Sequence, residues 1–314
     1  MKFPDKGTLL DLVKGSVATV TLFLAYVTFP LIGVLPGLFT PFPAIYYALK
    51  SGKTTGAAIV AVSAAVMAVM GGATVTLFFI LQSGVLSLAL PAFLTTERTG
   101  ARAIAYTVAI DLGAILLLAV VYGVTQGVNP HAQALKVIHT SISQVASLYE
   151  QVGVKGDELT ALQQGMQQAG ALIGRIYPSL MVVSLACIVG LNAAVLMKFS
   201  ARLPGLPAIG DFKGFKNPEQ LVWVLIVAGF AMLAKNQQVT TAALNVLVVI
   251  VSLYFIQGMA VIAHFFTRFA VPKFVRVLFY LFLALQPYLV VAVAALGIFD
   301  IWGNFRSPKQ QENL

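Results

Sequence analysis

Residues 103–124 read AIAYTVAIDLGAILLLAVVYGV, an apolar run that a single acid, Asp111, interrupts. The hydrocarbon core of a bilayer is about 30 Å thick, and a helix needs roughly 20 apolar residues to cross it. The run is long enough to do so. It therefore predicts that the chain is a helical membrane protein.

The composition of the whole chain leads to the same class. Of its 314 residues, 59% are hydrophobic and 10% are charged, and the mean hydropathy is +0.90. About a quarter of the residues are charged in a soluble domain. This balance excludes a soluble enzyme, a disordered protein and a nucleic-acid module. The net charge of +9 comes mostly from bases in short loops, where they orient membrane spans. No nucleic-acid partner is expected.

Further apolar runs predict an all-α bundle of about eight to nine spans, which form one integral membrane domain over residues 1–314. The spans are expected near 15–35, 56–72, 73–94, 103–124, 172–197, 218–234, 239–266 and 275–299. A ninth stretch, 35–49, is short and rich in proline. It either crosses the membrane or forms a re-entrant segment inside the bundle. With 35–49 crossing, a cytoplasmic N-terminus places most of the 20 Lys and Arg residues inside.

One long polar stretch, residues 130–171, separates the spans. Its apolar residues recur every three or four positions, at Leu135, Ile138, Ile142, Val145, Tyr149 and Val152, and then at Leu159, Leu162, Met166 and Ala169. This rhythm predicts an antiparallel pair of helices on the extracytoplasmic side. Either the two apolar seams only cover each other, or the hairpin is a docking arm or a lid.

The sequence lacks the common catalytic signatures. It has no phosphate-cradling loop, no G-x-S-x-G and no H-E-x-x-H. The single cysteine, Cys187, lies in an apolar run, and the three histidines have no acidic companions. We therefore expect no enzyme activity, no metal and no cofactor.

Four polar residues inside apolar runs are the candidate ligand-binding residues: Gln82, Asp111, Gln257 and Gln286. At 1.5 Å per residue, each lies about 14 to 16 Å from the nearest end of its span. Their convergence near the bilayer midplane is typical of a substrate or ion site in a transporter. An ionised Asp111 at that depth costs several kcal/mol unless it is paired or hydrated. Alternatively, the same side chains join neighbouring helices by hydrogen bonds.

Three stretches resemble the YybS-like family of bacterial membrane proteins. They are TPFPAIYYALKSGKTTG at 40–56, NVLVVIVSLYFIQGMAVIAHFF at 245–266 and LGIFDIWGNFR at 296–306. Asn304 departs from the pattern, which has an acid there. The resemblance marks a set of structural or partner-docking residues: Pro41, Pro43, Asn245, Gly258, Asp300, Trp302 and Arg306. Asp300 and Arg306 are expected to form an exposed pair that anchors Trp302 at the interface.

The resemblance also implies distant kinship with the S components of energy-coupling-factor vitamin transporters. Such subunits bind a small molecule and rely on ATPase partner subunits. The expectation is a binding or transport subunit of the bacterial cytoplasmic (inner) membrane, whose partners are the lipid bilayer, a small molecule and membrane or ATPase subunits. The alternative is a scaffold or biogenesis factor that recruits partners through the 130–171 hairpin. A weaker third hypothesis is a membrane enzyme acting on a lipid-linked substrate, for which the sequence lacks paired acids or metal ligands.

Overall fold

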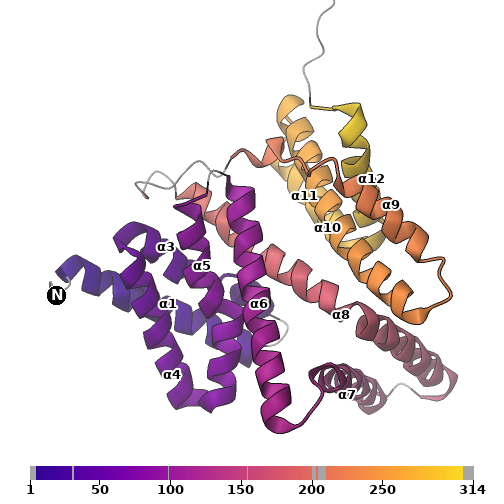
Figure 1. Ribbon diagram of the computed structural model, residues 1–314, viewed down its shortest axis with the longest axis horizontal. Coiled ribbons are helices and arrows are strands. Elements are labelled where there is room, and N and C mark those ends of the chain that lie inside the picture. Colours follow the sequence, from indigo (N-terminus) through magenta and orange to yellow (C-terminus); the bar gives the residue numbers. More distant parts are fainter. Residues whose placement is uncertain are drawn as a thin grey trace, which may run out of the picture. The chain divides into compact units, whose positions relative to one another are not determined.

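The computed structural model describes residues 5–29, 32–97, 99–153, 155–199, 203 and 210–306. All regular elements in these ranges are helices, which confirms the all-α prediction (Figure 1). By its internal contacts the chain divides into two compact units. Unit 1 comprises residues 1–133 and 184–209, and unit 2 comprises residues 134–183 and 210–314. Both units contain candidate spans, so a single membrane domain over 1–314 stays a prediction.

Unit 1 is built from the N-terminal helices and the last part of α8. Its elements are α1 (Lys6–Thr28), α2 (Val34–Leu38), α3 (Phe42–Ser51), α4 (Lys53–Phe79), the π-helical turn η1 (Ile80–Gly84), α5 (Val85–Leu94), α6 (Gly100–Gln126) and the C-terminal part of α8 (Gly156–Lys198).

The helix α4 reverses its direction at Gly72. This glycine has φ 72° and ψ −168°, a conformation that side chains with a Cβ rarely adopt. Val60 and Gly84 would lie about 36 Å apart on one straight helix. Instead, the space beside the Gly84 Cα is filled by the Val60 side chain. The arms before and after Gly72 therefore run antiparallel, as the expected spans 56–72 and 73–94 require.

The core of unit 1 lies between α1 and the two arms of α4. Phe23, Ile59, Met67 and Phe79 are fully buried in one cluster. The Phe23 and Phe79 rings meet edge to face at 5.2 Å. Burial of such large apolar side chains fixes α1 against α4.

Unit 2 contains the hairpin and the C-terminal helices. Its elements are α7 (Pro130–Gln151), the first part of α8, the 3-10 turn η3 (Phe212–Gly214), α9 (Leu221–Ala231), α10 (Gln237–Arg268), α11 (Lys273–Leu285) and α12 (Pro287–Gly303). The closest packing joins α10 and α12. Gly258 lies against the Val293 carbonyl, and Gly297 lies against the Tyr254 carbonyl, so the two backbones touch.

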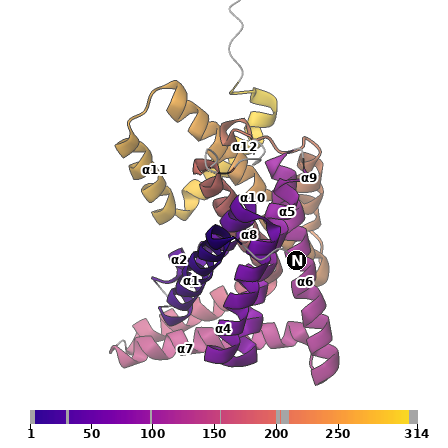
Figure 2. The same ribbon diagram turned by 90° about the vertical axis from the view of Figure 1, so that its left-hand side faces the viewer.

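The expected span 275–299 is not one continuous helix. It breaks at Gln286, whose backbone is extended, and α12 begins at Pro287. The axes of α11 and α12 differ by 111° (Figure 2). Proline lacks the amide hydrogen that would continue the first helix, and its ring fits the first position of a new one.

By length and composition, with the two arms of Lys53–Leu94 counted together, fewer helices of spanning length are found in the described part of the chain than the eight to nine expected. Five helices in the described ranges are long and apolar enough to cross a membrane: Lys6–Thr28, Lys53–Leu94, Gly100–Gln126, Gly156–Lys198 and Gln237–Arg268. The bent pair α11–α12 makes six if it counts as one span. The predicted eight to nine spans are not confirmed. The expected span 218–234 is reduced to the short α9, and 35–49 forms two short helices, α2 and α3.

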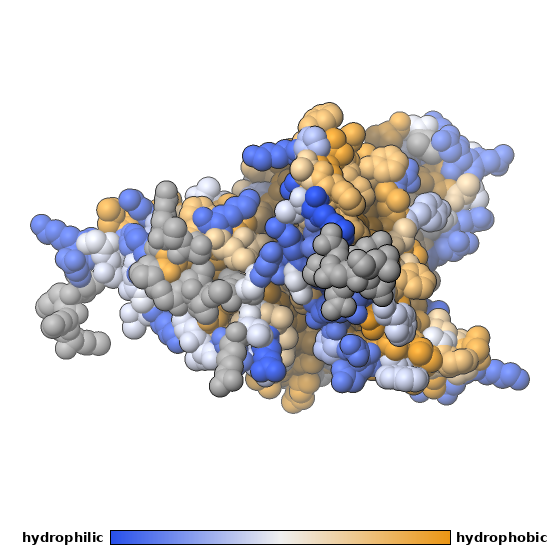
Figure 3. Space-filling view, turned by 90° about the horizontal axis from the view of Figure 1, so that it is seen from above, coloured by the Kyte–Doolittle hydropathy of each residue, from blue (hydrophilic) through white to orange (hydrophobic). Residues whose placement is uncertain are grey.

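Large apolar side chains lie on the surface of both units. Val69, Leu233 and Tyr288 are at least 80% exposed, and orange apolar residues lie beside blue hydrophilic ones in Figure 3. In water such surfaces would be unfavourable, but lipid tails solvate them. The helices therefore have the surface of a membrane protein.

The predicted hairpin seam is present along part of α7. Gly170 and Gly174 of α8 lie against Ile142 and Leu135 of α7, so these two helix segments run antiparallel. The second half of the seam was predicted wrongly, because Val145, Tyr149 and Val152 are exposed. The position of the hairpin outside the membrane stays a prediction.

Charges in the seam should separate the two hairpin helices. We expect Leu135→Asp and Ile142→Asp to speed proteolytic cleavage between residues 153 and 156, because a carboxylate at the contact with Gly170 or Gly174 disfavours the closed pair. Val152→Asp is the control, since Val152 is exposed. Equal cleavage of all three variants and the parent, measured by limited proteolysis in detergent, would refute a packed seam.

Candidate functional site

Asp111 lies on the buried face of α6. The buried residues of this helix lie along one face, at Gly100, Ala103, Thr107, Val108 and Asp111. Asp111 is fully buried, and neither of its carboxylate oxygens has a hydrogen-bond partner among the described residues. An uncompensated buried carboxylate is costly, so this position requires a physical reason.

The π-helical turn Ile80–Gly84 lies next to Asp111's helix. Both α4 and α6 pack against this turn. Single π turns widen a helix and occur frequently at functional sites. The side-chain oxygens of Gln82 and Ser83 are buried here, and neither has a hydrogen-bond partner within the described ranges.

Asp111 and the π turn lie at the same depth. The antiparallel helices α5 and α6 are packed together and joined by residues 95–99. Ser83 lies twelve residues before Thr95, and Asp111 lies twelve residues after Thr99. Each is therefore about 18 Å from this connection.

Two further hydroxyls, from α1 and α4, lie near the level of the π turn, because Val60, one helical turn before Ser63, packs against Gly84. Gly15 lies directly against Ile59, and Phe23 and Met67 share the core cluster, so α1 and α4 run parallel there. Thr19 and Ser63 follow Gly15 and Ile59 by four residues each, or one helical turn. Both are buried, and neither hydroxyl has a partner in the part of the chain that the structure describes. We call Thr19, Ser63, Gln82, Ser83 and Asp111 the polar belt.

An open groove of about 380 Å³ lies beside the C-terminal end of α1. It is mostly apolar and is lined by Tyr26, Val27, Val34, Thr74, Val75 and Phe78. Tyr26 lies seven residues beyond Thr19, so the groove is separate from the polar belt. The buried Phe23 ring, which contacts Phe78 and Phe79, lies between Tyr26 and Thr19 along α1.

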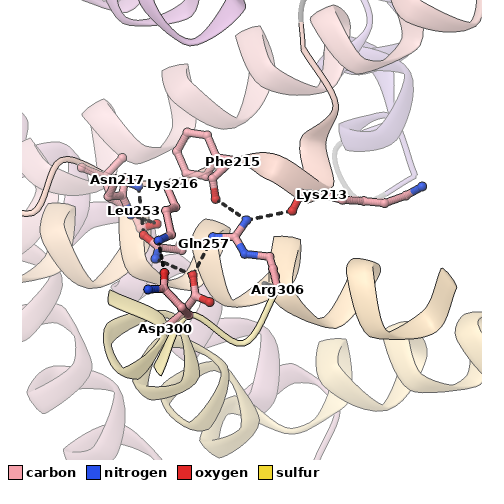
Figure 4. Close-up of polar contacts among 9 residues, drawn as sticks. Lys213, Phe215, Lys216, Asn217, Leu253, Gln257, Asp300 and Arg306 are labelled. Carbon is pink, nitrogen blue, oxygen red and sulfur yellow. Dashed lines mark hydrogen bonds and ion pairs between the residues drawn. The ribbon is translucent and has the colours of Figure 1, made fainter. Parts of the chain in front are cut away.

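A second polar cluster lies in unit 2 at the end of α12 (Figure 4). The Arg306 guanidinium is paired with the Asp300 carboxylate and donates to the Lys213 and Phe215 carbonyls at 2.7 and 2.9 Å. The predicted pair is therefore present, but its predicted exposure is wrong. The Asp300 side chain is fully buried and that of Arg306 is 10% exposed, because the segment before α9 covers them.

Gln257 belongs to this cluster. Its amide nitrogen donates to Asp300 at 3.0 Å, and its amide oxygen accepts the Asn217 backbone N–H at 2.9 Å (Figure 4). Lys216 donates to Asn304 at 2.6 Å, at the position where the family pattern has an acid. Both polar ends of the Gln257 side chain have protein partners. The cluster therefore fastens residues 213–217 to α10 and α12.

The four predicted ligand-binding residues do not form one described cluster. Gln82 and Asp111 lie in unit 1 and share the polar belt. Gln257 and Gln286 lie in unit 2, where Gln257 is bonded as above and Gln286 is exposed at the break between α11 and α12. Sequence reasoning also missed Thr19, Ser63 and Asn217. Their only sequence signal is a small polar residue within or beside an apolar run.

The remaining predicted residues have structural contacts. Asn245 donates to the Arg175 and Thr241 carbonyls at 2.7 and 2.9 Å, and it accepts the Ser179 N–H at 3.0 Å. These bonds hold α8 against α10 beside Pro178, which interrupts the α8 hydrogen-bond ladder.

The two prolines mark the start of α3. Pro41 precedes its first residue and accepts a hydrogen bond from Ser87 at 3.4 Å, and Pro43 is buried in its first turn.

Trp302 is 65% exposed at the end of α12. Among the described residues, no group of three or more His, Cys, Asp or Glu side chains is arranged to hold a metal ion.

Apolar helices of spanning length, lipid-type surfaces and buried polar side chains define a multi-pass membrane protein. The chain belongs to the family described as "Predicted membrane protein (DUF2232)", whose model matches residues 17–301. It is 24% identical over 294 residues to the uncharacterized protein YybS of Bacillus subtilis (strain 168), a match that covers 92% of this chain and 94% of YybS. The predicted YybS-like family is thus confirmed. No solved structure matches the chain.

Proposed function

We propose that this protein is a small-molecule binding or transport subunit and that the polar belt of unit 1 is its binding site. It is a non-enzymatic protein of the bacterial cytoplasmic membrane, with its N-terminus in the cytoplasm. We place the polar belt near the bilayer midplane, because Asp111 and Gln82 each lie about 14 Å from the nearest end of their expected spans. Coupling to membrane or ATPase partner subunits, which the resemblance to S components implies, belongs to the same proposal.

The observation that supports this proposal best is the unpartnered carboxylate of Asp111. Two other buried or half-buried side chains of this chain, which join helices, make several hydrogen bonds. Asn245 makes three, and Gln257 is bonded at both ends of its amide. Asp111 differs from both, although it is at least as enclosed. A carboxylate kept at such a cost favours a role in binding over a role in joining helices.

Small molecules that co-purify with the detergent-solubilised protein test this function. Mass spectrometry should find at least one compound enriched with the parent and reduced about tenfold or more in Asp111→Asn. A tenfold loss corresponds to about 1.4 kcal/mol, which is close to the lower end of the range for one hydrogen bond to a charged group. Asp157→Asn, an exposed site at the start of α8, is the matched control and should retain the compound.

The proposal fails if no compound depends on Asp111 while the variant elutes as the same folded species. It also fails if Asp111→Leu is as stable as the parent and retains every co-purifying compound. Size-exclusion chromatography of each variant excludes loss of the fold as the cause.

A scaffold or biogenesis role is the second candidate. It is favoured by α7, which has no buried residue, because its Val137 and Leu148 side chains, and that of Val152 just after it, are more than half exposed. Asp111→Asn separates the two functions, because a scaffold keeps its interactions and activity in cells when the carboxylate is neutralised.

A further inference from the structure

The unpartnered buried atoms of unit 1 share one chemistry. Within the described ranges, every buried side-chain atom of this unit that lacks a hydrogen-bond partner is an oxygen: Ser16 Oγ, Thr19 Oγ1, Thr40 Oγ1, Ser63 Oγ, Gln82 Oε1, Ser83 Oγ, Asp111 Oδ1, Asp111 Oδ2 and Asn192 Oδ1. Carboxylate and amide oxygens only accept hydrogen bonds, and hydroxyls accept as well as donate. A ligand that satisfies these atoms must therefore donate hydrogen bonds or bring positive charge.

No described basic side chain neutralises Asp111. The ion pair that the structure describes in unit 1 joins Lys50 to Asp11, near the N-terminal end of α1, at 2.9 Å. It does not include Asp111. On α6 itself the nearest base is Arg102, nine residues away or about 14 Å along the helix. An ionised Asp111 thus contributes one negative charge to a site of low dielectric.

From these two observations we infer that the polar belt binds a monovalent cation, which is either a protonated organic amine or an alkali metal ion. This inference rests on the proposed binding function and names the ligand class. One positive charge balances the single carboxylate, whereas an anionic ligand would add a second negative charge to the same enclosed site.

The donor set suits both sources of positive charge. An ammonium group donates up to three hydrogen bonds, which matches a carboxylate beside amide and hydroxyl oxygens. Alkali metal ions are hard cations, and hard cations take the same carboxylate, carbonyl and hydroxyl oxygens as ligands. The π turn places the Gln82 amide oxygen and the Ser83 hydroxyl at the level of Asp111, so the acceptors come from more than one helix.

Three organic probes of similar size distinguish charge from shape. Benzylammonium chloride, benzyl alcohol and magnesium benzoate share a ring and differ in charge, and NaCl and KCl provide the metal-ion arm. MgCl2 is added to keep the ionic strength constant. Mg²⁺ gives up its water reluctantly, so it is not expected to enter the site itself. The thermal unfolding midpoint of the purified full-length protein is measured with each probe and each variant.

We expect benzylammonium, Na⁺ or K⁺ to raise the unfolding midpoint of the parent and of the control Asp157→Asn. The apparent affinity of Asp111→Asn for the same cation should be at least about tenfold weaker. Gln82→Met removes a hydrogen-bond acceptor and nearly conserves the side-chain volume, so it should weaken binding of the same cation. This variant keeps the test valid if Asp111→Asn does not fold. Response to benzylammonium alone identifies an amine site, and response to Na⁺ or K⁺ alone identifies a metal-ion site.

Two results would overturn the inference. If benzoate or benzyl alcohol stabilises the protein in an Asp111-dependent way and no cation does, the ligand class is wrong while the binding function stands. If no probe shows a dependence on Asp111 or Gln82, the inference of a cation is also wrong. The binding function itself fails only if, in addition, no co-purifying compound depends on Asp111.

Discussion

An Asp300→Ala variant is expected to lose about 3 to 5 kcal/mol of stability, as is usual when one partner of a buried ion pair is removed. The Arg306 guanidinium would remain nine-tenths buried beneath the Lys213 and Phe215 carbonyls without its counter-charge. The Gln257 amide would lose an acceptor as well. The unfolding midpoint in detergent measures this loss.

Two further variants show whether the buried charge is the cause. Asp211→Ala removes a carboxylate that is 69% exposed, lies 3.9 Å from Lys213 and accepts the Lys213 backbone N–H, so it should lower the midpoint far less than Asp300→Ala does. The double variant Asp300→Ala, Arg306→Met should recover part of the loss, because no unpaired charge remains buried. A double variant as unstable as Asp300→Ala would show that the buried charge is not the cause.

The second large effect is expected at the contact between α10 and α12. A Cβ atom at position 258 would lie 1.9 Å from the Val293 carbonyl oxygen, which is backbone and cannot rotate away. Gly258→Ala must therefore force the two helices apart, and Gly258→Val must do so further. Overpacking of this kind costs typically about 1 to 3 kcal/mol, and we expect Val to reach or exceed the upper end.

Gly229 provides the control for this prediction. It lies in α9 of the same unit, and a Cβ atom there would meet nothing within 4 Å. Gly229→Ala should be neutral or slightly stabilising, since alanine favours a helix. Equal unfolding midpoints for Gly258→Val and Gly229→Ala would show that α10 and α12 do not touch as described.

The helical membrane class could be predicted well from the sequence, because apolar runs of spanning length are typical of membrane helices. The reversal at Gly72 was also expected, because the predicted spans 56–72 and 73–94 meet there. The 111° bend at Gln286 was harder to predict, because its size depends on how two short helices pack on either side of a proline. Hydropathy averages over such single residues, so the sequence indicated one span over 275–299 and not the angle within it.

The candidate site shows the same limit. Gln82 and Gln257 look alike in the sequence, since each is a glutamine in an apolar run beside a glycine or serine. Their environments differ because Asn217 and Asp300, both distant in the sequence, bond to Gln257. Whether a buried amide finds partners depends on tertiary contacts, which periodicity and depth along a span do not encode.

The most direct test of the proposed site is an experimental structure of the protein in lipid nanodiscs that resolves the surroundings of the Asp111 carboxylate. Our account predicts non-protein density within about 3.2 Å of a carboxylate oxygen, bounded by the other residues of the polar belt. A carboxyl group in dry packing, hydrogen-bonded to a side chain or carbonyl of a neighbouring helix, would contradict it.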